Sequence, residues 1–457
     1  MNYKPVIGIE VHVELNTKSK MFCRCSADYF GKEPNTHTCP VCLGLPGALP
    51  YTNEEAIKKC IQIGLALNCK ISETSLFERK NYFYPDLPKG YQISQYRWPL
   101  CIEGWLEISK AFLLTKGREV EGSKERRIRI NRVHQEEDTG KLTHAGKETL
   151  IDFNRSGVPL VEIVTEPDFS SSEEVREYAK KLQQIFRSLG VSNADMEKGD
   201  MRLEANVSLR EISNVKSQMS NGELPNYRVE LKNINSFRFM VAAIEYEIKR
   251  QTEALKRGER LTQETRGWDE DKKCTYLQRS KEEAHDYRYF PEPDLPGIFF
   301  DKEKIDQIKK SLSELPNIRI KRFEEDYGIN KTQAKMLVEK SGLAEYFERV
   351  MEVGKSWGIQ VNQVVNYLIN RKINTIKVSP EEVIAEIHDK DVGIIGDIGQ
   401  LEELAKQAIK ENTKAVEDFR NGKANAMQVL VGGVMKLSKG KAEPKKVLEI
   451  LSKLLNN

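Results

Sequence analysis

Apolar and polar positions alternate along several segments in the N-terminal part of the chain, and this pattern predicts strands with one buried and one polar face. The alternating segments are residues 6–15, 201–210 and 228–232. Their polar positions are Glu10, His12, Glu14, Arg202, Glu204, Asn206, Ser208, Arg228, Glu230 and Lys232. Such alternation is typical of antiparallel sheets with one polar face. In any single strand, exposure of that face to solvent is a sufficient explanation of the polar positions.

Two further strands are expected at residues 128–133 and 159–164, which are rich in apolar residues. The first runs into the acidic sequence Glu136, Glu137 and Asp138, and the second encloses Glu162. A carboxylate inside an apolar strand needs a partner, because an unpaired buried charge is costly. Divalent cations are natural partners, so these segments indicate a metal on the polar face.

Helical spacing replaces alternation in two regions. Residues 171–190 begin with the capping-box pair Ser171 and Glu174 and end at Gly190. From residue 301 onward long amphipathic segments follow one another, divided by the Gly- and Ile-rich residues 392–398. We therefore predict an α+β protein in three domains. They are a mixed, largely antiparallel sheet domain in residues 1–296, an all-helical domain in residues 297–397 and a helical tail domain in residues 398–457.

Length and charge agree with this division. The chain has 457 residues, more than the ~250 to 300 at which a single core stops growing. No segment offers the ~18 uncharged apolar residues of a membrane span, and no secretory or transit segment is recognisable, so we expect a cytoplasmic protein. Residues 419–457 hold eight Lys or Arg against two Glu, a local +6 that leaves −3 for the rest of a chain whose net charge is +3. A basic end of this kind is typical of a polyanion-binding segment or of a solvated surface.

Four of the eight cysteines form two close pairs, Cys23 with Cys25 and Cys39 with Cys42. Four thiolates at this spacing suit a tetrahedral Zn²⁺. Because four protein ligands leave no open position, the predicted zinc is structural and folds a ribbon in residues 20–45. The alternative is a set of reduced, buried cysteines without metal.

Carboxylates with one imidazole suit Mg²⁺ or Mn²⁺, and Mg²⁺ that keeps open water positions usually serves phosphate chemistry. Arg228 and Lys232 share a strand face with Glu230, which makes them candidate phosphate contacts. The motifs of P-loop NTPases, zinc proteases, α/β-hydrolases and dinucleotide-binding folds are absent from the sequence.

Several long stretches are distinctive beyond these patterns. They are IGIEVHVEL (7–15), CRCSADYFG (23–31), CPVCLGLPGALP (39–50), KNYFYPDLPKGYQISQY (80–96), HQEEDTGK (134–141), PLVEIVTEPD (159–168), ELKNINSF (230–237), DYRYFPEPDLP (286–296) and GKANAMQVLVGGVMKLSKGKAEP (422–444). Together they cover essentially the whole chain and resemble the GatB family, one of the subunit families of aspartyl/glutamyl-tRNA(Asn/Gln) amidotransferases.

The resemblance implies a two-step reaction in residues 1–296, the catalytic cradle domain of the family. The γ-phosphate of ATP passes to the side-chain carboxylate of Glu on tRNA(Gln) or of Asp on tRNA(Asn), and ammonia then displaces the phosphate to give the amide. A carboxylate is a poor acylating agent, and phosphorylation supplies the leaving group. Carried over residue by residue, the catalytic Mg²⁺ (or Mn²⁺) is bound by His12, Glu137 and Glu162. Glu10 and Glu230 are candidates for a second metal position, and Glu204, which stands where the family has an acidic residue, is a further candidate Mg²⁺ ligand.

The resemblance also implies partners. No glutaminase signature is recognisable in this sequence, so ammonia must come from a separate amidase subunit, braced by a small third subunit in a heterotrimer. The tail resembles the tRNA-binding domain of the family, and its candidate tRNA contacts are Lys436, Lys439, Lys441, Lys445 and Lys446.

Two other interpretations stay open at this point. In the first, the chain is a non-catalytic scaffold that positions tRNA for a partner. In the second, it is an ATP-dependent amide synthetase that acts on a free small acid. The acidic face argues against the scaffold, because carboxylates repel phosphates unless a metal lies between them. Product formation without tRNA would reveal the synthetase.

Overall fold

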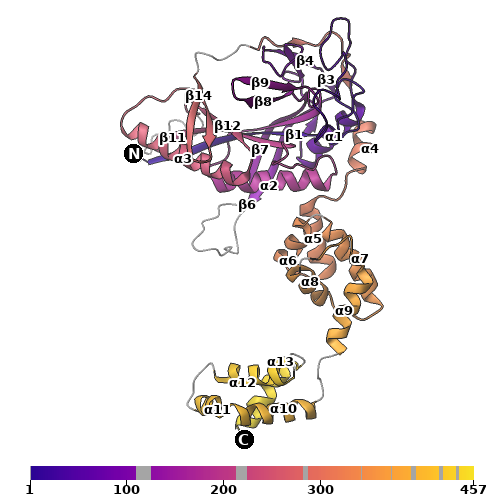
Figure 1. Cartoon of the computed structure of the whole chain (residues 1–457), viewed down its shortest axis with the longest axis vertical. Coiled ribbons are helices and arrows are strands. Elements are labelled where there is room, and N and C mark those ends of the chain that lie inside the picture. Colours follow the sequence, from indigo (N-terminus) through magenta and orange to yellow (C-terminus); the bar gives the residue numbers. More distant parts are fainter. Residues whose placement is uncertain are drawn as a thin grey trace. The chain divides into compact units, whose positions relative to one another are not determined.

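A computed structural model describes residues 2–109, 125–212, 224–280, 287–340, 342–371, 373–392, 398–420, 426–438 and 442–456. The chain divides into two compact units, Met1–Pro316 and Asn317–Asn457. All strands of the described residues lie in the first unit, and the second unit is built of helices (Figure 1).

A nine-stranded sheet is the centre of the first unit (Figure 1). Across the sheet the order is β14 (Cys274–Ser280), β13 (Glu264–Asp269), β12 (Val229–Ile234), β11 (Met201–Ile212), β1 (Asn2–Glu14), β10 (Pro159–Thr165), β7 (Glu125–Glu137), β6 (Cys101–Ser109) and β2 (Lys70–Ile71). Only β12 and β13 pair in parallel among these neighbours. The prediction of a mixed α+β protein with a largely antiparallel sheet is confirmed.

Helices pack on the apolar side of this sheet. The helices of the first unit are α1 (Glu54–Ala66), α2 (Ser172–Ser188), α3 (Phe237–Lys256) and α4 (Lys302–Lys310). α1 packs on β6 and β7, α2 on β6, and α3 on β11, β12 and β14. The apolar positions of β1 share one buried core with these helices, so the alternating polar positions of β1 point to the opposite face.

Helix α2 begins where its sequence predicts. The Ser171 hydroxyl oxygen accepts a hydrogen bond of 3.3 Å from the backbone N–H of Glu174. This contact satisfies one of the amide groups that a helix leaves unpaired at its start. Val175, Tyr178 and Leu182 then follow at helical spacing and are fully buried in the core.

Smaller sheets lie beside the large one. β15 (Phe290–Pro291), β4 (Glu78–Asn81) and β5 (Tyr91–Ser94) form a three-stranded sheet, β16 (Ile298–Phe299) pairs with β3 (Thr74–Ser75), and β8 (Lys141–Ala145) pairs with β9 (Glu148–Asp152). Within the three-stranded sheet Lys80 of β4 lies opposite Gln92 of β5. Gln92 in turn donates a hydrogen bond of 3.2 Å to Glu136 of β7. The three-stranded sheet therefore adjoins the polar face of the large sheet.

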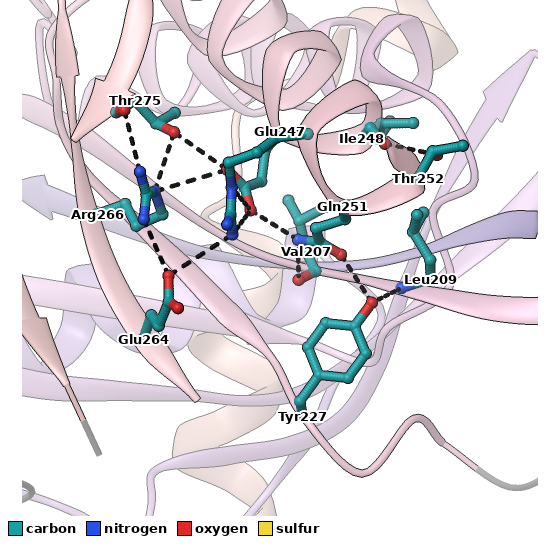
Figure 2. A network of polar contacts seen from close by, with 11 residues as sticks. Val207, Leu209, Tyr227, Glu247, Ile248, Gln251, Thr252, Glu264, Arg266 and Thr275 are labelled. Carbon is teal, nitrogen blue, oxygen red and sulfur yellow. Dashed lines mark hydrogen bonds and ion pairs between the residues drawn. The ribbon is translucent and has the colours of Figure 1, made fainter. Parts of the chain in front are cut away.

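A buried polar network fastens α3 to the other end of the large sheet (Figure 2). The Glu247 carboxylate lies 2.6 Å from the Arg250 guanidinium and accepts hydrogen bonds from Thr275 (3.1 Å) and Gln251 (2.9 Å). The Glu247 side chain is fully buried, and Arg266 lies 3.8 Å away. A buried carboxylate needs such partners, so the network holds α3, β13 and β14 together.

The second unit contains two separate buried clusters, within residues 323–387 and 401–451. Its helices are α5 (Pro316–Tyr327), α6 (Lys331–Glu339), α7 (Leu343–Lys355), α8 (Val361–Asn370), α9 (Pro380–Val392), α10 (Ile398–Glu411), α11 (Thr413–Arg420), α12 (Ala426–Leu437) and α13 (Pro444–Asn456). The predicted boundary between two helical domains adjoins residues 393–397, which lie outside the described residues. The division into three domains stays a prediction. Among the described helices, none combines the length and the apolar character that crossing a membrane requires.

Candidate active site

A row of three polar side chains crosses three neighbouring strands on the polar face. His12 of β1 lies opposite Glu162 of β10, and Glu162 lies opposite His134 of β7. Residues directly opposite each other in a sheet share a face, so the pairing register brings these side chains together. The Nε2 atom of His134 is 2.9 Å from a carboxylate oxygen of Glu162.

Glu136, two residues after His134, completes this group. Its Oε1 atom is 3.3 Å from the Nε2 of His134 and accepts a hydrogen bond of 2.6 Å from the Ser94 hydroxyl. His12, Glu136 and Glu162 offer ligand atoms that all lie within 4.8 Å of one another, and both carboxylates are buried. We call these three residues the first metal-ligand group.

The charges in this group are interdependent. Burial alone raises the pKa of Glu162, but His134, His12 and Lys80 outweigh burial and hold the pKa well below its usual range. Burial lowers the pKa of His134, and the two carboxylates outweigh it and raise that pKa. His134 and Lys80 therefore supply positive charge that keeps Glu136 and Glu162 ionised, the state in which a carboxylate binds a metal.

The structure places one predicted ligand, Glu137, apart from the other two. Glu137 does not join His12 and Glu162, because neighbouring residues of a strand point to opposite faces. Glu136, and not Glu137, projects from the polar face beside them. The Glu137 carboxylate oxygens each lie 2.6 Å from the Lys89 amine, and one accepts a hydrogen bond of 2.9 Å from the backbone N–H of Ile93. Glu137 and Lys89 line a cavity of about 140 Å³ that Cys23 and Cys42 also border.

A second acidic group adjoins the first. Carboxylate oxygens of Glu10, Glu204 and Glu230, from β1, β11 and β12, lie within 4.8 Å of one another. The Lys232 amine lies among them, 3.0 Å from Glu204 and 3.4 Å from Glu230. Burial, and then the charges of Glu162 and Glu204, raise the pKa of Glu10. The arrangement can bind a cation, and we call Glu10, Glu204 and Glu230 the second metal-ligand group.

The candidate phosphate contacts differ in their surroundings. Lys232 is held by two carboxylates, whereas Arg228 lies directly before β12 with an exposed side chain. Both belong to the β12 end of the polar face, which β11 and β1 separate from β10 and β7 in the strand order.

The four cysteines of the predicted ribbon come together. The sulfur atoms of Cys23, Cys25, Cys39 and Cys42 lie within 4.8 Å of one another. Cys42 is favoured as a thiolate: a hydrogen bond from Cys23, assisted by the charge of Lys20, lowers the pKa of Cys42 to about 4. The Lys20 amine is 3.7 Å from the Cys42 sulfur. Four sulfurs so placed can hold a metal ion.

The tail lysines are described only in part. Lys436 is exposed on α12, and the Lys446 amine pairs with Glu443 at 2.9 Å. Lys439, Lys441 and the side chain of Lys445 lie outside the described residues.

The sequence alone assigned no individual role to His134, Glu136 or Lys80, which the structure places at this site. The signal for the first two was present in the run HQEED, since alternate residues of a strand share a face. Whether the even-numbered or the odd-numbered residues of β7 lie on the polar face follows only from the pairing register of β7 with β10. Lys80 gave no local signal, because a separate small sheet brings it to Glu136.

Comparison with known proteins bears on the identity of this site. Residues 5–306 match the GatB/GatE catalytic domain, and residues 330–455 match the GatB domain. The B subunit of the aspartyl/glutamyl-tRNA(Asn/Gln) amidotransferase of Thermotoga maritima is 44% identical, over 100% of this chain and 99% of its own length. The protein of the same name from Caldicellulosiruptor saccharolyticus is 45% identical, over 99% of this chain and 98% of its own length. The chain therefore belongs to the GatB family of tRNA-dependent amidotransferases.

Proposed function

We propose that this chain converts Glu-tRNA(Gln), Asp-tRNA(Asn) or both into the amidated forms in two steps. ATP first phosphorylates the side-chain carboxylate, and ammonia then displaces the phosphate. The observation that carries the proposal is the first metal-ligand group. Its three metal-ligand atoms lie within 4.8 Å of one another on the polar face of the sheet. Two buried carboxylates and one imidazole form a donor set that suits Mg²⁺ or Mn²⁺.

The residues have separate roles in this proposal. His12, Glu136 and Glu162 hold the catalytic Mg²⁺, and the second metal-ligand group holds a second or transient ion. When bound, Mg²⁺ neutralises phosphate charge and aligns the reacting groups. Lys232 and Arg228 contact the phosphates of ATP from the β12 side. Glu137, paired with Lys89, is not part of the metal site.

Ammonia and assembly require other chains. We propose a heterotrimer in which an amidase subunit is the source of ammonia and a small third subunit braces the complex, as expected for a chain of this family. The cytoplasm is the proposed location, because aminoacyl-tRNA is made and used there.

The cysteine group is proposed to bind structural Zn²⁺. Support comes from the mutual distances of the four sulfurs and from the lowered pKa of Cys42, since the thiolate is the form that binds metal.

The tail is proposed to bind tRNA. Its support is the net charge of +6 in residues 419–457, together with a buried apolar cluster within residues 401–451.

The first prediction tests the chemistry with Glu162→Gln in the complex reconstituted with both partner chains. Glu-tRNA(Gln), ATP, Mg²⁺ and ammonium chloride are supplied without glutamine, so the glutaminase of the amidase chain is bypassed. We expect Gln-tRNA formation to fall at least a hundredfold, because the neutral amide is a weak metal ligand, while tRNA binding stays unchanged. Glu166→Gln, outside the metal-ligand groups, serves as control. Full activity in Glu162→Gln would remove the metal site from the proposal.

A second prediction concerns zinc. The purified chain should contain about one zinc per molecule, and Cys39→Ser should lose most of it and lower the thermal stability. Cys274→Ser, which alters a cysteine outside the group, should leave the zinc content unchanged. Metal analysis that finds no zinc in the wild type would favour the reduced-cysteine alternative.

The third prediction concerns the tail. Ending the chain at residue 397 should weaken tRNA binding at least tenfold, because phosphate contacts dominate such affinity, and should leave Mn²⁺ binding intact. Filter-binding titration of both forms measures the difference. Equal tRNA affinities would contradict the assignment.

A further inference from the structure

Four tyrosines form a continuous row of rings beside the first metal-ligand group. The ring centroids of Tyr82 and Tyr287 are 5.7 Å apart, those of Tyr287 and Tyr289 6.1 Å, and those of Tyr289 and Tyr96 4.8 Å. Tyr289 and Tyr96 are stacked, with planes 14° apart. Tyr96 at the end of the row is 51% exposed. We call these residues the tyrosine row.

A cation stands at each end of the row. The Lys80 amine lies 5.9 Å from the ring centroid of Tyr82 and 5.1 Å from that of Tyr287. The Arg132 guanidinium lies 5.3 Å from the ring centroid of Tyr96. The Nε atom of Arg132 is buried and has no hydrogen-bond partner among the residues that the structure describes. Its N–H is thus an unused donor beside an aromatic surface.

The row is adjacent to the reacting groups. Lys80 pairs with Gln92 across β4 and β5, and Gln92 donates a hydrogen bond of 3.2 Å to Glu136. Arg132 precedes His134 by two residues on β7, so both project from the same face. Aromatic rings flanked by cations are the surface on which unpaired nucleic-acid bases stack.

We propose that the exposed end of the tyrosine row, with Arg132, binds the 3′-terminal adenine of the tRNA. This inference rests on the proposed function. The amino acid is esterified to the terminal ribose, so the reacting carboxylate and the terminal base are separated only by that ribose and a few bonds. When the substrate carboxylate lies at the first metal-ligand group, the terminal adenine of the same tRNA must therefore lie close by. The tyrosine row is adjacent to that group.

The adenine of ATP is the other base that could stack, and the strand order argues against it. Phosphoryl transfer places the attacking and leaving oxygens roughly in line, on opposite sides of the transferred group. Lys232 and Arg228 lie on the β12 side of His12, whereas the tyrosine row lies on the β7 side. If the phosphates of ATP lie toward Lys232, the acceptor carboxylate and its tRNA enter from the opposite side, where the tyrosine row lies.

The test is a double-mutant cycle on binding, in the reconstituted complex without ATP. Uncharged tRNA(Gln) and the same tRNA lacking its terminal adenosine are titrated against the wild type and Tyr96→Leu. We expect loss of the adenosine to weaken wild-type binding about tenfold, the range for one stacked base. Tyr96→Leu should bind intact tRNA about tenfold more weakly and lose little more on truncation. Tyr96→Phe, which keeps the ring, should behave as the wild type.

Tyr276→Leu provides a matched control, because Tyr276 is 44% exposed on the distant edge strand β14. Equal losses on truncation in the wild type and in Tyr96→Leu would overturn the assignment. So would an unchanged tRNA affinity of Tyr96→Leu together with a weaker affinity for ATP in a separate ATP titration, which would assign the tyrosine row to the nucleotide. A wild-type complex that binds neither intact tRNA(Gln) nor intact tRNA(Asn) would instead contradict the proposed function itself.

Discussion

The two-residue alternation of strands buried on one face is the constraint on which the rest of this structure depends. Because α1, α2 and α3 cover the apolar side of the sheet, every second side chain of β1, β10 and β7 must project to the other side. That side gathers carboxylates from five neighbouring strands, and like charges at this separation repel one another strongly. The face is therefore stable only with cations: His134, Lys80 and Lys232 supply part of the charge, and bound metal is proposed to supply the rest.

The positions of the two metal-ligand groups, Lys232 and the tyrosine row on the sheet determine the sides from which the two proposed substrates approach. The second metal-ligand group and Lys232 lie toward β12, a strand on which α3 packs. The buried Glu247 network fastens α3 to the adjoining strands β13 and β14 (Figure 2). The three-stranded sheet lies toward β7, with Lys80 on its strand β4 and the tyrosine row in the segments that flank its strands. Nucleotide and aminoacyl end can thus approach the first metal-ligand group from opposite sides, and a rigid sheet keeps the two approaches apart.

Sequence patterns predicted the local structure well and the site less completely. Period-two alternation located β1 and β11, and the Ser171 cap located the start of α2, because these features depend on neighbours in sequence. The choice between Glu136 and Glu137 depends on which set of positions in β7 faces Glu162 of β10, and a shift of one residue exchanges the sets. Lys80 reaches the site through a sheet whose third strand comes from residues 290–291, a long-range pairing that local pattern does not encode.

The most direct test of the account compares Mn²⁺ binding by Glu136→Gln and Glu137→Gln, two neighbouring substitutions of the same chemistry. Calorimetric titration of each full-length chain measures the dissociation constant without any requirement for activity. The account predicts that Glu136→Gln weakens Mn²⁺ binding at least tenfold, while Glu137→Gln stays within about twofold of the wild type, because only Glu136 faces His12 and Glu162. Weak binding in Glu137→Gln together with normal binding in Glu136→Gln would contradict it.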